Sequence, residues 1–300
     1  MTLVQAASTA GLSGLHQQAE ALADRLPPLL VAAERVAATV AQGVHGRRRV
    51  GVGETFWQFR PYQPGDSTAR IDWRQSARST QLFLRDQEWE AAETVWLWVD
   101  ASGSMAYRSA PRLPTKQDRA TLLMLALASL LTRAGERIAL LGDKRRPTGG
   151  RAGVTSLCER LAGQASGGAS GVPAQPLPRH ARLVLISDFF IPLEDLREQL
   201  RGFLAMGVRG HLLQVLDPAE PSLPFAGRVR FEGLEHDGSA LIDNVDSVRT
   251  RYRDRIAAHR QGLRDLVRSL GWTLASHVCD HPPEPPLLAL YNALSTKAQG

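Results

Sequence analysis

Short apolar runs alternate with helical patterns through the centre of the chain. The runs occupy residues 95–99, 138–141, 183–186 and 212–216. Residues 117–134 and 193–206 have the length and apolar content of helices. Because the runs are apolar at nearly every position, we expect strands that are covered on both faces. The pattern predicts an α/β fold with a mostly parallel sheet and helices on both faces.

Further elements are predicted on either side of this centre. Residues 14–42 have helical spacing that Pro27 and Pro28 should break or kink, so we interpret residues 1–45 as a helical N-terminal extension. The other predicted elements are a strand over 56–59, a hairpin over 228–242, a helix over 248–270, a strand over 272–278 and a helix over 287–294.

We expect residues 46–300 to form one domain. Its parts are an upstream block (46–90), a core (91–220) and a C-terminal hairpin, helix and strand (221–300). The many aromatic side chains of residues 57–85 predict that this segment packs on the same domain, because they carry too much apolar surface to leave exposed.

Composition and charge exclude several classes of protein. The formal net charge is +6, from 36 Lys and Arg against 30 Asp and Glu, but the two signs are interspersed, which favours a solvated surface over a nucleic-acid-binding stripe. Cys158 and Cys279 are too few for a disulfide framework. The longest apolar run, 122–131, is about half of the roughly 20 residues that span a bilayer. We expect a cytoplasmic protein without membrane insertion.

A candidate metal site follows two of the predicted strands. Asp100, Ser102 and Ser104 come directly after the first strand and could supply three oxygens from one tight loop. Asp188 follows the strand over 183–186, at the same edge of a parallel sheet. Hard cations such as Mg²⁺ prefer oxygen ligands, here expected at about 2.1 Å. The alternative is that these residues only cap turns and helices.

The spacing Asp-x-Ser-x-Ser with a later Ser-Asp resembles the metal-ion-dependent adhesion site of von Willebrand factor A domains. The upstream block resembles the signature of the bacterial domain of unknown function 58 family. The matching segments are residues 48–56 (RRVGVGETF), 60–66 (RPYQPGD), 70–73 (RIDW) and 76–78 (SAR). The resemblance implies a von Willebrand factor A-like fold, a bound divalent cation such as Mg²⁺, and a MoxR-type AAA+ ATPase as partner.

The chain departs from the adhesion-site pattern at one ligand. A threonine from an intervening loop normally completes such a site, and here Thr148, Thr155 and Ser170 compete for that role. Ser170 lies in a Gly- and Ser-rich stretch from 163 to 178 that has the composition of a flexible loop.

The upstream block has two interpretations. Its charges alternate in sign around a Pro-Gly turn, which suits an ion-pair network that fixes the segment, or else a surface that docks a partner. The residues concerned are Arg60, Pro64, Gly65, Asp66, Arg70, Asp72 and Trp73.

Two functions remain in competition. The first is a metal-dependent protein-interaction module, not an enzyme, whose cation takes a carboxylate from a partner. The second is a Mg²⁺-dependent phosphoesterase or nuclease that uses Asp100 and Asp188, although neither acid motif has a histidine or glutamate beside it as a general base. The sequence holds no GxxxxGK phosphate loop and no GxSxG motif, which argues against ATP hydrolysis and serine-hydrolase chemistry.

Overall fold

The computed structural model describes residues 30–41, 56–62, 71–79, 81–87, 93–163, 171–234 and 238–295. The chain divides into two compact units. One consists of residues 1–46 and 94–300, and the other of residues 47–93.

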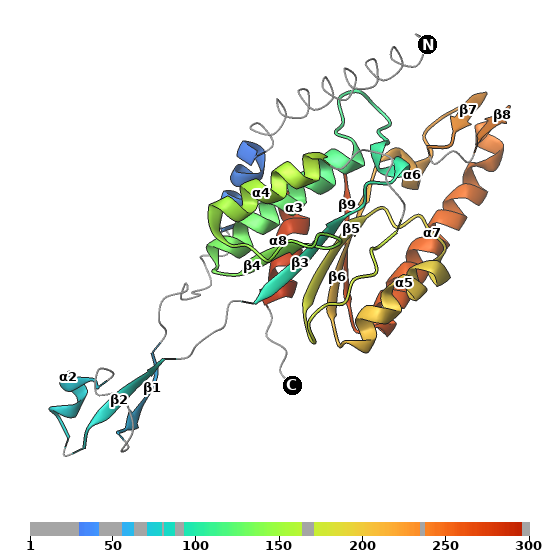
Figure 1. Ribbon diagram of the computed structural model, residues 1–300. Coiled ribbons are helices and arrows are strands. Elements are labelled where there is room, and N and C mark those ends of the chain that lie inside the picture. The colour runs from blue at the N-terminus through green and yellow to red at the C-terminus, as the bar shows by residue number, and fades with distance from the viewer. Residues whose placement is uncertain are drawn as a thin grey trace, which may run out of the picture. The chain divides into compact units, whose positions relative to one another are not determined.

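A five-stranded sheet forms the centre of the larger unit (Figure 1). Its strands are β3 (Thr94–Val99), β4 (Arg137–Leu140), β5 (Arg182–Ser187), β6 (Arg209–Leu216) and β9 (Thr273–Val278). They lie in the order β4-β3-β5-β6-β9, and each neighbouring pair is parallel. The prediction that β3 and β5 are adjacent inner strands is confirmed.

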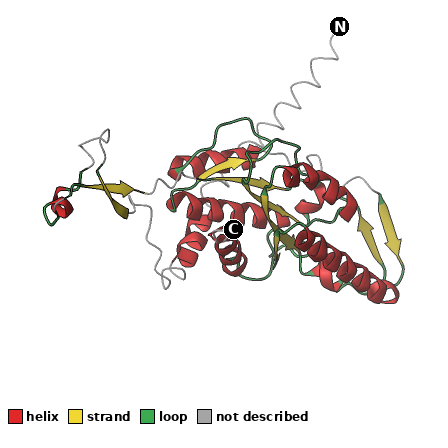
Figure 2. Cartoon of the chain, turned by 90° about the horizontal axis from the view of Figure 1, so that it is seen from below, coloured by secondary structure: helices red, strands yellow, loops and turns green. Residues whose placement is uncertain are grey.

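Helices cover both faces of this sheet (Figures 1 and 2). The helices are α3 (Lys116–Arg133), α4 (Gly150–Gly163), α5 (Leu193–Ala205), α7 (Val245–Ser269) and α8 (Glu284–Ser295). Alternate side chains of β3 serve the two sides: Val95 and Leu97 pack with residues of α3, α4 and α8, whereas Trp96 packs with residues of α5 and α7. The predicted α/β fold class, a mostly parallel sheet with helices on both faces, is confirmed.

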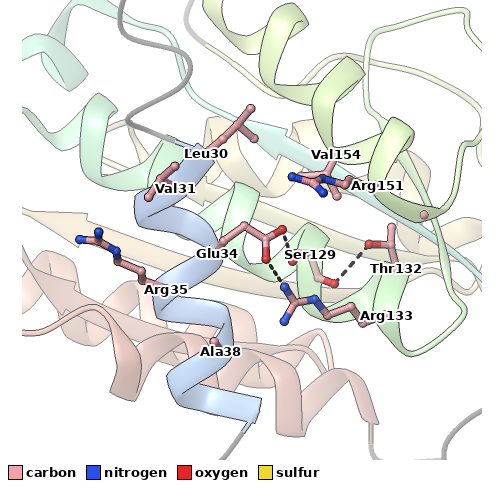
Figure 3. Close-up of a pocket in the computed structure, with 11 residues that line it drawn as sticks. Leu30, Val31, Glu34, Arg35, Ala38, Ser129, Thr132, Arg133, Arg151 and Val154 are labelled. Carbon is pink, nitrogen blue, oxygen red and sulfur yellow. Dashed lines mark hydrogen bonds and ion pairs between the residues drawn. The ribbon is translucent and has the colours of Figure 1, made fainter.

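The N-terminal extension contributes a helix to the core of the larger unit. Residues 30–41 are helical, and Ala33, Val36, Ala37 and Val40 are buried at helical spacing in the cluster that contains α3 and α4. Figure 3 shows Glu34 of this helix directed at α3, where its carboxylate accepts a hydrogen bond from Ser129 and pairs with Arg133. The rest of the predicted helix, from residue 14 to 29, lies outside the described residues.

The remaining elements are small. In the larger unit these are the 3-10 helix η2 (Gly103–Ala106), the short helix α6 (Ala219–Ser222) and the predicted hairpin, formed by β7 (Val229–Glu232) and β8 (Ser239–Ile242). The smaller unit has the antiparallel pair β1 (Phe56–Pro61) and β2 (Phe83–Gln87), with α2 (Trp73–Ser76) between them in sequence. That residues 57–85 pack on the α/β domain stays a prediction.

Two expectations from composition bear on the described part of the chain. Cys158 and Cys279 are both free and buried, as expected. Among the described helices, none combines the length and apolar character that crossing a membrane requires.

Candidate metal centre

Three aspartates stand at one edge of the sheet, each directly after a strand. Asp100 follows β3, Asp188 follows β5 and Asp217 follows β6. Because these strands are parallel neighbours in the order β3-β5-β6, their carboxyl ends open on the same edge. This is where an α/β sheet presents ligand-binding side chains.

Asp100 organises the loop after β3. Its Oδ1 accepts the backbone N–H of Ser102 at 2.9 Å, and its Oδ2 accepts the hydroxyl of Ser187 at 2.7 Å. Asp100 is 5% exposed and Ser102 2% exposed, so both side chains are buried although they lie outside the sheet. The first contact is the turn-capping role expected as the alternative to metal binding, and the second ties the loop to the end of β5.

The four predicted ligands form one connected group. The Oγ atoms of Ser102 and Ser104 are 3.2 Å apart, and the Ser104 hydroxyl donates to Asp188 Oδ2 at 2.8 Å. Adjacent ligands of an octahedral ion with bonds of about 2.1 Å lie about 3 Å apart. The spacing of these oxygens therefore fits a shared hard cation.

The donors of this group are mixed. Within the described residues, no group of three or more His, Cys, Asp or Glu side chains is placed to hold a metal ion. A cation at this edge would therefore depend on the serine hydroxyls of the Asp-x-Ser-x-Ser loop as much as on the carboxylates. Two carboxylates with two hydroxyls suit Mg²⁺, which usually retains some water.

A buried lysine and a glutamate join the group, and neither was predicted. Lys116 is 1% exposed at the first position of α3, and its Nζ donates to Asp188 Oδ2 at 2.6 Å. The same ammonium donates to Oε1 of Glu220 in α6, whose Oε2 accepts the backbone N–H of Asp217 at 2.7 Å. The rings of Tyr107 and Phe190 flank it, with centroids 5.9 and 5.2 Å from Nζ.

These charges shift the pKa values of their neighbours. Burial lowers the pKa of Lys116, but Asp188 and Glu220 outweigh that effect and hold it above its ordinary value. Burial raises the pKa of Glu220, and the neighbouring Lys116 ammonium offsets only part of that effect. Burial, with the charges of Asp217 and Glu220, raises the pKa of Tyr107 to about 12. Lys116 is thus an ammonium at neutral pH, and Tyr107 is a neutral phenol.

Neither described candidate for the missing hydroxyl ligand lies at this edge. Thr148 pairs with Ile138, which pairs in turn with Val95 at the start of β3, several residues before Asp100. Thr155 is exposed on α4, and its hydroxyl donates to the Arg151 carbonyl. Ser170 lies outside the described residues.

Three of the upstream residues lie within the described part of the chain. Asp72 caps α2, where its Oδ1 accepts the backbone N–H of Gln75 at 2.9 Å, and Trp73 is 65% exposed. The strand β1 includes Arg60, whereas Pro64, Gly65, Asp66 and Arg70 lie outside the described residues. The choice between an ion-pair network and a docking surface therefore stays open.

The sequence contained signals for the unpredicted residues. Asp217 follows the strand β6 as Asp100 follows β3, with Glu220 three residues further on. Lys116 is one of only three lysines, and it begins a helix that contains the longest apolar run of the chain, residues 122–131. What the sequence could not supply is the pairing of Lys116 with acids 72 and 104 positions away.

A pocket elsewhere in the larger unit is separate from this group. It has a volume of about 620 Å³ and lies between the helix at residues 30–41, the last turn of α3 and the first turn of α4 (Figure 3). Lys116 is at the opposite end of α3, so the pocket and the acidic edge are distinct features.

Comparison with known proteins identifies relatives of the chain. It is 29% identical over 255 residues to uncharacterized proteins from Mycobacterium tuberculosis (strain H37Rv) and Mycobacterium bovis, covering 79% of this chain and 78% of each relative. Two solved structures show distant likeness: the conserved hypothetical protein BatB from Bacteroides thetaiotaomicron (13% identity, TM-score 0.42) and an aerotolerance-related membrane protein from Bacteroides fragilis (12%, 0.43). Each alignment covers 68% of this chain and 98% of the other.

The family model described as "Protein of unknown function DUF58" matches residues 58–262, which include residues 58–90 of the upstream block, all four predicted ligands, Lys116 and Glu220. The chain therefore belongs to the domain of unknown function 58 family.

Proposed function

We propose that the protein is a metal-dependent protein-interaction module, a partner or adaptor of a MoxR-type AAA+ ATPase. The observation that supports this most is the approach of Ser102, Ser104 and Asp188 at the carboxyl edge of the sheet, with oxygen spacings of 3.2 and 2.8 Å. Asp100 adjoins this group through its hydrogen bond from the Ser102 backbone N–H. The nature of the partner rests on the family resemblance.

These four side chains would hold a divalent cation, and the cation would supply an electrophilic centre for a carboxylate from the partner. The chain's own residues determine the shape of that centre. Asp100 fixes the Ser102 backbone, Ser187 ties Asp100 to β5, and Asp188 receives the Ser104 hydroxyl. Ser104 is partly exposed, whereas Ser102 is buried, so we place the approach of a partner on the Ser104 side.

The alternative, a phosphoesterase, requires a general base. Glu220 is the acid that joins the group, but its two oxygens accept hydrogen bonds from Lys116 and from the backbone of Asp217. A carboxylate held in this way is poorly placed to take a proton from water. This favours binding over hydrolysis.

The proposal is tested with a variant that removes one negative charge from the candidate site and keeps the size of the side chain. Asp100→Asn keeps an acceptor for the Ser102 N–H and removes the negative charge. Asp143→Asn makes the same change at the partly buried ion pair with Arg160, which has no contact with the candidate ligands among those described. Tagged wild-type and variant proteins are purified from their own cells, with and without a chelator. We expect an ATPase to co-purify with wild type and Asp143→Asn, and to be lost with Asp100→Asn or chelator.

Two results would contradict the proposal. One is partner retention that is the same in all samples. The other is hydrolysis of a phosphodiester by purified wild type with Mg²⁺ or Mn²⁺ that Asp100→Asn abolishes, which would instead establish the enzyme.

A further inference from the structure

Lys116 is a buried cation in direct contact with Asp188, one of the candidate metal ligands. Its side chain is 1% exposed, it donates to both Asp188 and Glu220, and two aromatic rings flank it. A buried ammonium is costly unless carboxylates compensate it, and here both partners are also shielded from solvent, with Asp188 3% and Glu220 13% exposed at their side chains. The chain thus places one of its own charges in a site suited to a positive ion.

The ammonium and the candidate ligand set meet at a single atom. Asp188 Oδ2 accepts the Ser104 hydroxyl at 2.8 Å and the Lys116 ammonium at 2.6 Å. A divalent cation held by Ser104 and Asp188 would lie close to this ammonium, and like charges at such distances repel strongly away from bulk water. Full occupation of Asp188 by both is therefore unfavourable.

Glu220 binds the same ammonium at the same time as Asp188. It receives Lys116 on one oxygen and is anchored through the other by the backbone of Asp217, at the end of β6. The lysine side chain has rotatable bonds enough to leave Asp188 and remain with Glu220. The two carboxylates thus share one charge, and only Asp188 of the two belongs to the candidate ligand set.

We infer that Lys116 is the built-in counter-ion of this site and sets its affinity for divalent cations. With the ammonium on Asp188, the site is partly neutralised without metal, and a divalent cation binds as the ammonium withdraws to Glu220. The inference rests on the proposed metal-binding function and adds a residue that determines when the site takes a cation.

The experiment measures Mn²⁺ binding to the purified full-length chain by electron paramagnetic resonance of the free ion, with Mg²⁺ as competitor. Lys116→Met removes the charge while retaining most of the side-chain volume, and we expect Mn²⁺ affinity to rise about tenfold or more. Lys116→Arg keeps a positive charge and should give no such gain. Glu220→Gln removes the second carboxylate, confines the ammonium to Asp188 and should weaken Mn²⁺ binding.

Folding is checked by circular dichroism, since Lys116→Met leaves two buried carboxylates without their cation. If that variant does not fold, Glu220→Gln decides: weaker binding than wild type supports the inference, and unchanged or tighter binding overturns it. Lys116→Met that folds but binds Mn²⁺ no better than wild type also overturns it, whether or not wild type binds.

The readout separates this inference from the proposed function. Tighter Mn²⁺ binding by Lys116→Met stands even if no partner is lost from Asp100→Asn, in which case only the interaction module fails. The converse outcome is that chelation releases the partner but Lys116→Met binds Mn²⁺ with unchanged affinity. That outcome would support the interaction module and contradict the role of the lysine.

Discussion

Close packing leaves no room for a side chain at Gly210 of β6. A Cβ built on Gly210 would lie 1.8 Å from Cε3 of Trp272, a ring that packs at the start of β9 and donates its indole N–H to the Val208 carbonyl. The glycine is therefore required by contact between the two elements and not by an unusual backbone angle.

Gly210→Ala should destabilise the fold by roughly 3 kcal/mol, because the Trp272 ring must shift and its hydrogen bond is strained. Gly202→Ala is the matched control, since nothing lies within 4 Å of its Cβ in the middle of α5, and we expect a gain of roughly 0.5–1 kcal/mol. Urea unfolding measures both changes. Equal stability of the two variants would show that the ring moves aside freely.

A buried histidine makes stability depend on pH. Burial, with nearby Arg182 and Arg209, lowers the pKa of His211 to about 4 from 6.5, and its Nδ1 lies 2.8 Å from the Thr273 hydroxyl on β9. Between pH 6.5 and 4 the unfolded chain takes up a proton at this residue and the folded chain does not. Stability contributed by neutral His211 is therefore complete above about pH 6.5 and is lost as pH falls toward 4.

His211→Gln should flatten that dependence by up to roughly 3 kcal/mol between pH 7 and pH 4. The exposed His281 provides the control, and His281→Gln should leave the wild-type profile nearly unchanged. Chemical unfolding at a series of pH values gives the comparison. A wild-type profile in His211→Gln would assign the acid sensitivity to other groups, such as His277, whose pKa is also lowered to about 4 by burial.

At the scale of elements, the sheet could be read from the sequence, whereas part of the helical layer could not. Each strand of the sheet is a local apolar run, so β3, β5 and β6 were predicted within a few residues. The helix α4 was not predicted, because Gly149, Gly150 and Gly153 obscure it, although Val154, Leu157, Cys158 and Leu161 are buried at helical spacing.

The same contrast holds for the candidate site. Asp100, Ser102, Ser104 and Asp188 stand in short motifs at strand ends, so their approach follows from parallel pairing alone. Lys116 and Glu220 reach the site from the starts of α3 and α6, and their contacts depend on how those helices pack on the sheet. No local pattern encodes that packing.

The helix at residues 30–41 should be an integral part of the larger unit. Ala37 is fully buried in its core, so Ala37→Asp would bury an unpaired charge and cost roughly 3 kcal/mol or more. Thr39 is exposed on the same helix, and Thr39→Asp should change stability by less than about 1 kcal/mol. Thermal unfolding of both variants checks this. If Ala37→Asp is as stable as wild type, the helix does not contribute to the stability of the larger unit, and the prediction is wrong.

On the scale of the whole molecule, the two faces of the sheet are buried in two separate apolar clusters. One holds residues of α3, α4, α8 and the helix at 30–41, and the other holds residues of α5 and α7. The strands are shared, and alternate residues of each strand belong to different clusters. Because both clusters depend on the same five strands, we expect them to be lost in one cooperative transition.

Tryptophan is distributed unevenly between these clusters, so tryptophan fluorescence reports on only one side of the sheet. Trp96, Trp98 and Trp272 are all buried in the cluster with α5 and α7, and the described residues of the opposite cluster include no tryptophan. Trp98 is two positions before Asp100, so its fluorescence emission can report structural changes near the carboxyl ends of the strands. A fluorescence signal from these indoles that changes before the far-ultraviolet dichroism does would report that one layer can loosen while the other still holds the strands together.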